Sequence, residues 1–270
     1  MFLRGSLGYG GLDVYLGENM IRVKFLGVGD ASQQGLGHAS IVLETLYGSP
    51  GAQRMLVDCG PGVIDSFIAE YDCLPDAVFI THCHLDHIAD FEKLFIKSWF
   101  HKPKQHRPKI FVPITIVELL HSRVGSYPEA LAEGGVNFWD AFQLIPVQDS
   151  FQFHDLCYQI FPARHHGLNS AYSLYLNDCF FYSGDTRPVP EVIEHKLDEK
   201  CTIFHDCSVL GNPSHTGIDD LIREYTPKTL QRLYAYHYHD ASEGPRFIER
   251  GIKIVEPMST FEFLLPKKYQ

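Results

Sequence analysis

Residues 81–87 read Thr-His-Cys-His-Leu-Asp-His and directly follow the apolar run Ala77–Ile80. On an extended backbone alternate residues share a face, so His82 and His84 point the same way and Cys83 points into packing. Past the strand end the chain turns, and Asp86 and His87 can then face a second position nearby. Imidazoles and a carboxylate at this density suit Zn²⁺. The alternative is a run of exposed histidines, which the preceding apolar strand makes the weaker interpretation.

Strand and helix patterns continue on both sides of this motif. Strands come in groups with helices between and after them, which indicates an α/β fold of two sheets with helices outside rather than strict βαβ alternation. The span 122–141 is rich in turn residues, and we expect a solvated loop there, with a lid or an interface loop as the alternatives. The sequence predicts strands at 21–27, 39–44, 54–58, 77–80, 109–112, 142–147, 151–162, 171–176, 180–183, 202–204 and 232–236, and helices at 63–71, 90–100 and 218–225.

Length and composition fit one globular domain. The 270 residues are 45% hydrophobic and 21% charged, which excludes a disordered chain or a coiled coil. We expect a single domain at 20–270, preceded by a Gly-rich extension at 1–19. The net charge of -10 disfavours general binding to nucleic acid or to an anionic membrane. Seven cysteines without a CxxC pair, and no long apolar stretch, predict a soluble cytoplasmic protein.

Further metal-type ligands follow predicted strands downstream, and the 15 histidines of the chain raise the expectation of metal. They are the pair His165-His166, then Asp185, and finally His237 or His239. A carboxylate such as Asp185 can bridge two cations about 3.5–4 Å apart, and a water between them becomes a nucleophile near neutral pH.

The motif HxHxDH, followed by an isolated His, a Gly-Asp and a last His, resembles the metallo-β-lactamase fold superfamily from about Met20 onward. The segments VKFLGVGDA (23–31) and LVDCGPG (56–62) resemble its first strand with its loop and its second motif. The resemblance implies an αββα sandwich, in which two mixed β-sheets pack face to face with helices outside. In the second motif, Asp58 typically supports the site from behind.

The resemblance also implies two divalent metal ions, with Zn expected and Mn or Fe as alternatives. Asp185 would bridge them, and Asp86 is expected to take part in catalysis as well as in binding. His166 remains an alternative to His165, and His239 an alternative to His237. The implied ligands are His82, His84 and His165 for one metal, and Asp86, His87 and His237 for the other.

Two segments resemble the tRNase Z branch of the superfamily: YSGDTRP at 182–188, and IFHDCS at 203–208 with PSHTG at 213–217. They imply that His215 donates a proton to the leaving group, a contribution of about 10²–10⁴-fold, with Asp206 orienting it. The alternative for His215 is a helix-entry residue. Asp206 stands where that branch has Glu, and its spacing to His215 is short, so its orienting role stays open.

The tRNA-binding arm of that branch has no room here, since only twenty positions separate His165 from Asp185. Armless relatives with this motif set act on small phosphodiesters, including cyclic nucleotides. We therefore expect a metal-dependent phosphodiesterase for a small or cyclic, nucleotide-like substrate. It would be a homodimer with no membrane contact and no stable nucleic-acid complex. The alternatives are a tRNase Z-like ribonuclease, a lactonase or thioesterase on the same fold, and a non-catalytic metal-binding protein.

Overall fold

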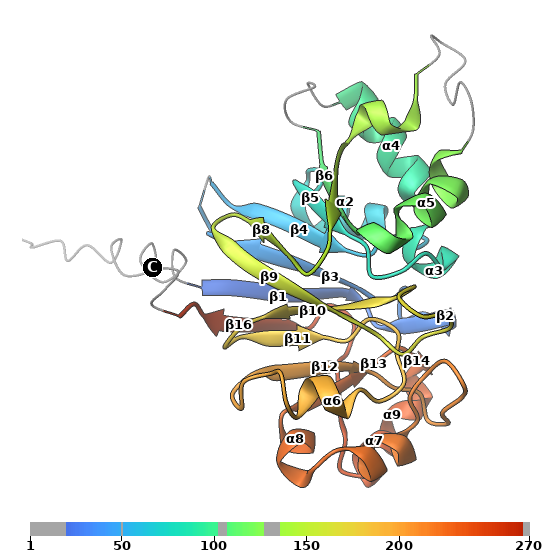
Figure 1. Cartoon of the computed structure of the whole chain (residues 1–270), viewed down its shortest axis with the longest axis vertical. Coiled ribbons are helices and arrows are strands. Elements are labelled where there is room, and N and C mark those ends of the chain that lie inside the picture. Colours follow the sequence, from blue (N-terminus) through green and yellow to red (C-terminus); the bar gives the residue numbers. More distant parts are fainter. Residues whose placement is uncertain (1–19, 50, 102–106, 127–135, 267–270) are drawn as a thin grey trace, which may run out of the picture.

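The computed structural model describes residues 20–49, 51–101, 107–126 and 136–266. Two seven-stranded sheets pack against each other, and helices cover the outer side of each sheet (Figure 1). The expected αββα sandwich of mixed sheets is thus confirmed. The proposed extension at 1–19 lies outside the described residues.

The first sheet has the order β16-β1-β3-β4-β5-β6-β7. It is antiparallel from β16 to β4 and parallel from β4 to β7. Its strands are β1 (Met20–Gly27), β3 (Ser40–Thr45), β4 (Gln53–Val57), β5 (Ala77–Phe79), β6 (Lys109–Pro113), β7 (Gln143–Val147) and β16 (Thr260–Leu264). The helices of this half are α2 (Val63–Tyr71), α3 (Leu85–Ile88), α4 (Phe91–His101) and α5 (Val117–Leu120), with short turns η2 (Ile114–Ile116), η3 (His121–Gly125) and η4 (Phe138–Ala141).

The second sheet has the order β15-β13-β12-β11-β10-β9-β8, with β11, β12, β13 and β15 parallel. Its strands are β8 (Ser150–Phe153), β9 (Leu156–Pro162), β10 (Tyr172–Leu176), β11 (Phe180–Tyr182), β12 (Thr202–Asp206), β13 (Leu233–Tyr236) and β15 (Lys253–Ile254). Its helices are α6 (Pro190–Ile193), α7 (Ile218–Glu224), α8 (Pro227–Gln231) and α9 (Gly244–Glu249), with the turn η5 (Ala241–Glu243). A separate parallel pair joins β2 (Gly29–Gln34) to β14 (Tyr238–Asp240).

Aromatic side chains fill the space between the sheets. Phe25 of β1 meets Phe204 of β12 with ring centroids 5.0 Å apart, and Phe111 of β6 stacks on Phe151 of β8 at 4.3 Å. Both pairs join one sheet to the other, and such contacts contribute about 0.5–1.5 kcal/mol beyond area burial. These contacts therefore fix the position of one sheet relative to the other.

Two sequence-based expectations were wrong. The span 151–162 is two strands joined by a tight turn, because His154 and Asp155 both adopt positive φ (47° and 59°) without a glycine to reveal it. The described flanks of 122–141 are only partly solvated, because buried residues alternate there with exposed ones such as Ser122 and Asn137. Val124 and Phe138 are buried there, and Phe138 stacks on Phe95 of α4 at 5.2 Å. Residues 127–135 lie outside the described part of the chain.

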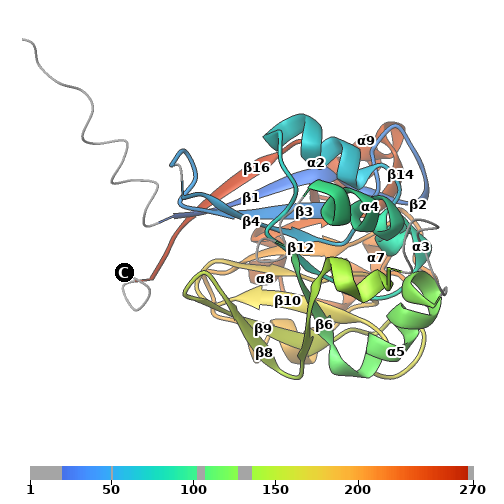
Figure 2. The ribbon, with the colours of Figure 1, turned by 90° about the horizontal axis from the view of Figure 1, so that it is seen from above.

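The arrangement gathers one end of the sandwich around α3. In Figures 1 and 2, α3, β2 and β14 lie together at the end of the sandwich opposite the C-terminal end of β16. The parallel strands β11, β12 and β13 bring their carboxyl ends to the same edge of their sheet. In α/β sheets this edge is where functional side chains collect. Of the described helices, none is long and apolar enough to cross a membrane.

Candidate metal centre

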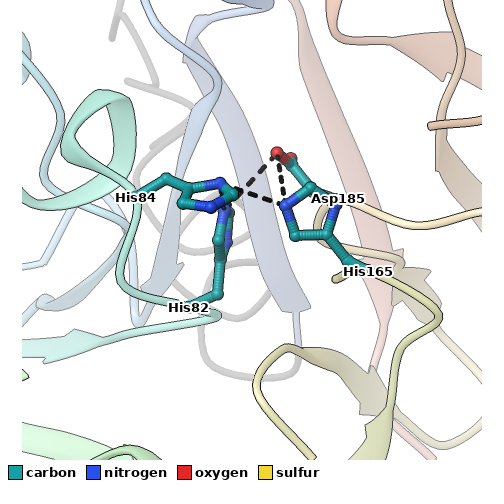
Figure 3. Close-up of side chains that lie close together, drawn as sticks. All are labelled: His82, His84, His165 and Asp185. Carbon is teal, nitrogen blue, oxygen red and sulfur yellow. Dashed lines mark hydrogen bonds and ion pairs between the residues drawn. The ribbon is translucent and has the colours of Figure 1, made fainter. Parts of the chain in front are cut away.

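The first donor cluster joins the end of β5 to the loop after β9. His82 forms an isolated antiparallel bridge with Ala171, which ties the histidine motif of the first sheet to the second sheet. His82 and His165 present Nε2 and His84 presents Nδ1, with His84 Nδ1 3.1 Å from His82 and 3.0 Å from His165 (Figure 3). Asp185 Oδ2 lies 3.5 Å from His82 Nε2. Tetrahedral zinc ligands at about 2.0–2.1 Å from the metal stand about 3.3 Å apart, so these spacings fit one ion.

The second donor cluster consists of Asp86, His87 and His237 with the same Asp185. His87 Nε2 lies 3.2 Å from Asp86 Oδ2 and 3.3 Å from Asp185 Oδ2. His237 Nε2 lies 3.4 Å from Asp185 Oδ1 and 3.9 Å from Asp86 Oδ2. Asp185 Oδ2 thus lies near His82 of the first cluster and His87 of the second, and Oδ1 lies near His237, so this carboxylate stands between the two clusters, where a bridging ligand is needed.

The alternative histidines belong to neither donor cluster. The His166 ring is near His84, with centroids 4.7 Å apart, but its side chain belongs to neither donor set. The Nδ1 of His239 lies 3.6 Å from Asp30 Oδ1 instead. The structure therefore brings together His165 and His237, and we propose these two as the ligands.

Asp58 lies behind His87, as the second motif implied. Its carboxylate accepts hydrogen bonds from Thr81 N at 2.8 Å, Thr81 Oγ1 at 2.7 Å and His87 Nδ1 at 2.8 Å. A proton held on Nδ1 leaves Nε2 of His87 free to act as a ligand. Asp58 follows β4 and Thr81 follows β5. The parallel pairing of these two strands brings the two residues together.

Glycines allow the ligand loops to approach each other. A Cβ on Gly60 would lie 1.7 Å from the carbonyl oxygen of Asp86, so only glycine permits this contact. Gly184 has φ 60°, and a Cβ there would lie 2.8 Å from the carbonyl oxygen of Tyr172. The Ser-Gly-Asp turn after β11 is therefore the local feature that aims Asp185 at the histidines.

Several buried polar atoms of the clusters lack a protein partner. His87 Nε2, His237 Nε2 and Asp185 Oδ1 are buried without a hydrogen bond among the described residues. Buried polar groups are almost always satisfied, and an unpaired one costs about 1–3 kcal/mol. Buried nitrogen and oxygen atoms that lie this close together without hydrogen bonds are suited to bind a divalent metal ion.

The charge state of the site suits metal binding. Burial opposes a charge on Asp185, yet His237, His87 and His82 hold its pKa well below the usual range, so it is a carboxylate. Burial, with the neighbouring His165 and His166, lowers the pKa of His84 to about 4. At neutral pH this imidazole is therefore uncharged, which is the form that binds a metal.

His215 and Asp206 form a pair beside the second cluster. His215 Nδ1 donates to Asp206 Oδ2 at 2.9 Å, and the His215 ring stacks on His237 with centroids 5.0 Å apart. Burial opposes the charged form of His215, but the hydrogen bond and the charge of Asp206 outweigh it and raise its pKa. His215 also lies in the bend just before α7. Its role as a helix-entry residue is therefore compatible with its contact with Asp206.

A cavity of about 190 Å³ opens over these residues, and we call it the His215 cavity. The sequence analysis missed Asp30, Ser32, Ser208 and Asn212, which line it in addition to residues of the two clusters. It also missed His38. Burial lowers the pKa of this histidine, and the negative charge of Asp86 opposes that shift only in part. Asp30 and Ser208 lie in two of the segments that resemble family motifs, at 23–31 and 203–208, whereas Ser32, Asn212 and His38 lie outside every quoted motif.

A family profile described as Anti-Pycsar protein Apyc1 matches residues 21–261. The chain belongs to this family. A relative from Paenibacillus harenae, also named Anti-Pycsar protein Apyc1, is 28% identical over 216 residues, which cover 77% of this chain and 88% of the relative.

Solved structures show the same fold. The metallo-β-lactamase fold protein YhfI from Bacillus subtilis superimposes with a TM-score of 0.70 at 15% identity, covering 90% of this chain and all of YhfI (100%). A diphosphatase from the PhnP family superimposes with a TM-score of 0.68 at 16% identity, covering 91% and 98% of the two chains. The expected metallo-β-lactamase fold is confirmed, and the donor clusters of this family member support a divalent-metal hydrolase.

Proposed function

We propose that this chain is a dinuclear metal-dependent phosphodiesterase that cleaves a small or cyclic, nucleotide-like substrate. The observation that carries the proposal is the position of His215, which lines the same cavity as Asp86, Asp185 and His237. His215 is held by Asp206 but belongs to neither of the two donor clusters that share Asp185, so it is available to act on the substrate. The relatives' name describes action against Pycsar, and we extend that role to this chain.

The ligand residues have distinct tasks in this proposal. His82, His84 and His165 would hold one ion, and Asp86, His87 and His237 the other, with Asp185 between them. When bound, two divalent ions would stabilise negative charge on the phosphoryl oxygens and acidify water. Zn²⁺ suits these nitrogen and carboxylate donors best, and Mn or Fe are the alternatives.

His215 would deliver the proton that the leaving oxygen needs. Its Nδ1 is occupied by Asp206, so Nε2 carries the transferable proton. An alkoxide is a poor leaving group at neutral pH, and a positioned acid accelerates its departure by about 10²–10⁴-fold. Asp206 keeps the ring oriented and stabilises its charged form.

Two rival functions predict different behaviour. A lactonase or thioesterase needs no acid for an alkoxide of this kind. A tRNase Z-like ribonuclease needs an arm between His165 and Asp185, where the chain forms β10 and β11, joined by a short turn. The presence of His215 and the short connection between His165 and Asp185 therefore favour a small phosphodiester.

The test compares two leaving groups. His215→Ala should slow hydrolysis of a 3′,5′-cyclic nucleotide by about 10²-fold or more, because an alkoxide must leave. It should slow bis-p-nitrophenyl phosphate far less, because p-nitrophenolate leaves unaided. His195→Ala, at an exposed histidine after α6, is the matched control. Equal losses on both substrates would contradict the acid role, and turnover of lactones or thioesters with no phosphodiester cleavage would overturn the proposed function.

A further inference from the structure

The loop between β12 and α7 carries His215, and we call its residues 207–217 the His215 loop. The loop is closed at its base, where Ser208 N donates to Thr216 O at 2.9 Å. Thr216 Oγ1 donates to Thr186 O at 2.7 Å, which ties the base to the residue that follows Asp185. The base of the loop is therefore fixed, whereas the peptide groups just before His215 depend on other contacts.

The peptide group between Ser214 and His215 is held on both sides. Its N–H, on His215, donates to Asn212 Oδ1 at 3.0 Å, and its carbonyl oxygen, on Ser214, accepts from His165 Nδ1 at 2.9 Å. Asn212 Oδ1 also accepts Ser214 N at 2.8 Å, which holds the preceding peptide group. Because a peptide group is planar, a rotation about its long axis would disturb both of its hydrogen bonds together. The backbone that carries His215 is therefore held between Asn212 and a histidine of the first donor cluster.

This arrangement is compatible with metal ions at both clusters. A proton on His165 Nδ1, held by the Ser214 carbonyl, leaves Nε2 free as a ligand, so the bond to Ser214 persists when an ion is bound. On the other side of the loop, His215 Nδ1 donates to Asp206 Oδ2 at 2.9 Å. Two consecutive residues thus connect the first donor cluster to the proton donor of the proposed function.

We propose that Asn212 is a positioning residue for proton transfer by His215. The inference rests on the proposed function, in which His215 gives a proton to the leaving oxygen. Asp206 holds Nδ1 of the ring, but the direction of Nε2 also depends on the backbone to which the ring is attached. Asn212 is exposed and lines the His215 cavity, so it supports the loop without filling the core. Without its side chain two backbone N–H groups lose their acceptor, and the peptide group before His215 is held on one side only.

The experiment compares Asn212→Ala, which removes the acceptor, with Asn212→Asp, which keeps it. Each lost hydrogen bond lowers the population of the ordered loop by about 2- to 10-fold, so Asn212→Ala should lower kcat for a 3′,5′-cyclic nucleotide by about 10-fold or more. Its kcat for bis-p-nitrophenyl phosphate should change by less than about twofold, because p-nitrophenolate leaves without a proton. Asn212→Asp should restore the wild-type ratio of the two rates, and the ratio cancels an effect of the added charge on anion binding.

Asn137→Ala is the matched control. Asn137 Oδ1 likewise accepts a backbone N–H, that of Trp139 at 2.9 Å, and the residue is exposed and outside the lining of the His215 cavity. This variant should change neither rate.

Three kinetic outcomes would overturn the inference. Wild-type rates on both substrates in Asn212→Ala would mean that Asp206 alone positions the ring. An equal loss on both substrates would mean that Asn212 only supports the loop or contacts the phosphate. An Asn212→Asp protein with the same altered ratio as Asn212→Ala would mean that hydrogen-bond acceptance is not the reason for the loss.

A wild-type protein that hydrolyses neither substrate would refute the proposed function, and proton NMR then decides the positioning role separately. The downfield resonance of the His215 Nδ1 proton is identified by its loss in His215→Ala. It should be sharp in the wild type and in Asn212→Asp, and broadened or absent in Asn212→Ala. Its absence from the wild type, or an unchanged resonance in Asn212→Ala, would refute the role of Asn212.

Discussion

Asp58→Asn exchanges one carboxylate oxygen for an amide nitrogen at constant size. Asn also tolerates the positive φ of 63° at this position, so the backbone need not move. With its oxygen kept on Thr81 N, the new NH₂ group faces His87 Nδ1, where two donors would meet. This clash of two donors is removed when the proton of His87 moves from Nδ1 to Nε2. Nε2 is the atom that lies in the second donor cluster. We therefore expect weaker metal binding in a folded protein.

The magnitude follows from the role of Asp58 as the partner of a ligand. Loss of such a partner lowers metal affinity by about 10- to 100-fold. At a free metal concentration of about 100 Kd the wild type gains about 2.7 kcal/mol of stability, and a 100-fold weaker variant gains about 0.4 kcal/mol. For a domain of this size 1 kcal/mol shifts Tm by about 2–4 °C, so the metal-induced rise in Tm falls from about 5–11 °C to about 1–2 °C.

The assay has two readouts. A chromophoric chelator in competition measures the affinity for zinc, and thermal unfolding with and without zinc measures the shift in Tm. Asp76→Asn is the control, because Asp76 accepts the backbone N–H of Arg54 on an exposed part of the same sheet. A folded Asp58→Asn protein with wild-type zinc affinity would refute the reasoning, since the tautomer of His87 would then not matter.

Three further expectations follow from the site. The wild type should bind about two metal ions per chain and Asp185→Ala at least one fewer, because Asp185 belongs to both clusters; elemental analysis of purified protein checks this, and unchanged content would remove the bridging role. Gly60→Ala should lower the free energy of unfolding by at least about 3 kcal/mol in urea, since its Cβ would overlap the carbonyl of Asp86, whereas Gly51→Ala, with its nearest atom at 3.8 Å, should change it by less than about 0.5 kcal/mol. A precursor tRNA should be processed poorly by a preparation that hydrolyses a small diester, and efficient 3′-trailer removal on a gel at physiological salt would contradict the small-substrate proposal.

Local pattern was sufficient for the regular elements with strong periodicity. The helix expected at 63–71 is α2 to the residue, because Val63, Ile64 and Phe67 form one buried face. The hairpin of β8 and β9 was missed because its turn uses His154 and Asp155 in positive φ, which composition does not announce. The strand β16 was missed although its residues alternate strictly between exposed and half-buried, with Phe261 and Phe263 on the half-buried side.

The sequence by itself predicted a metal site, because the residue types at 81–87 and the isolated His and Asp residues after later strands are those of metal ligands. The grouping of strands predicted two sheets with helices outside, and the resemblance to the metallo-β-lactamase fold superfamily implied that the two sheets form a sandwich. The choice of His165 over His166 depended on tertiary structure, since both are histidines at adjacent positions and only the path of the loop decides which ring enters the cluster. Asp30 and Asn212 likewise line one cavity with His215 only because the fold brings together segments far apart in sequence, and no local pattern encodes that proximity.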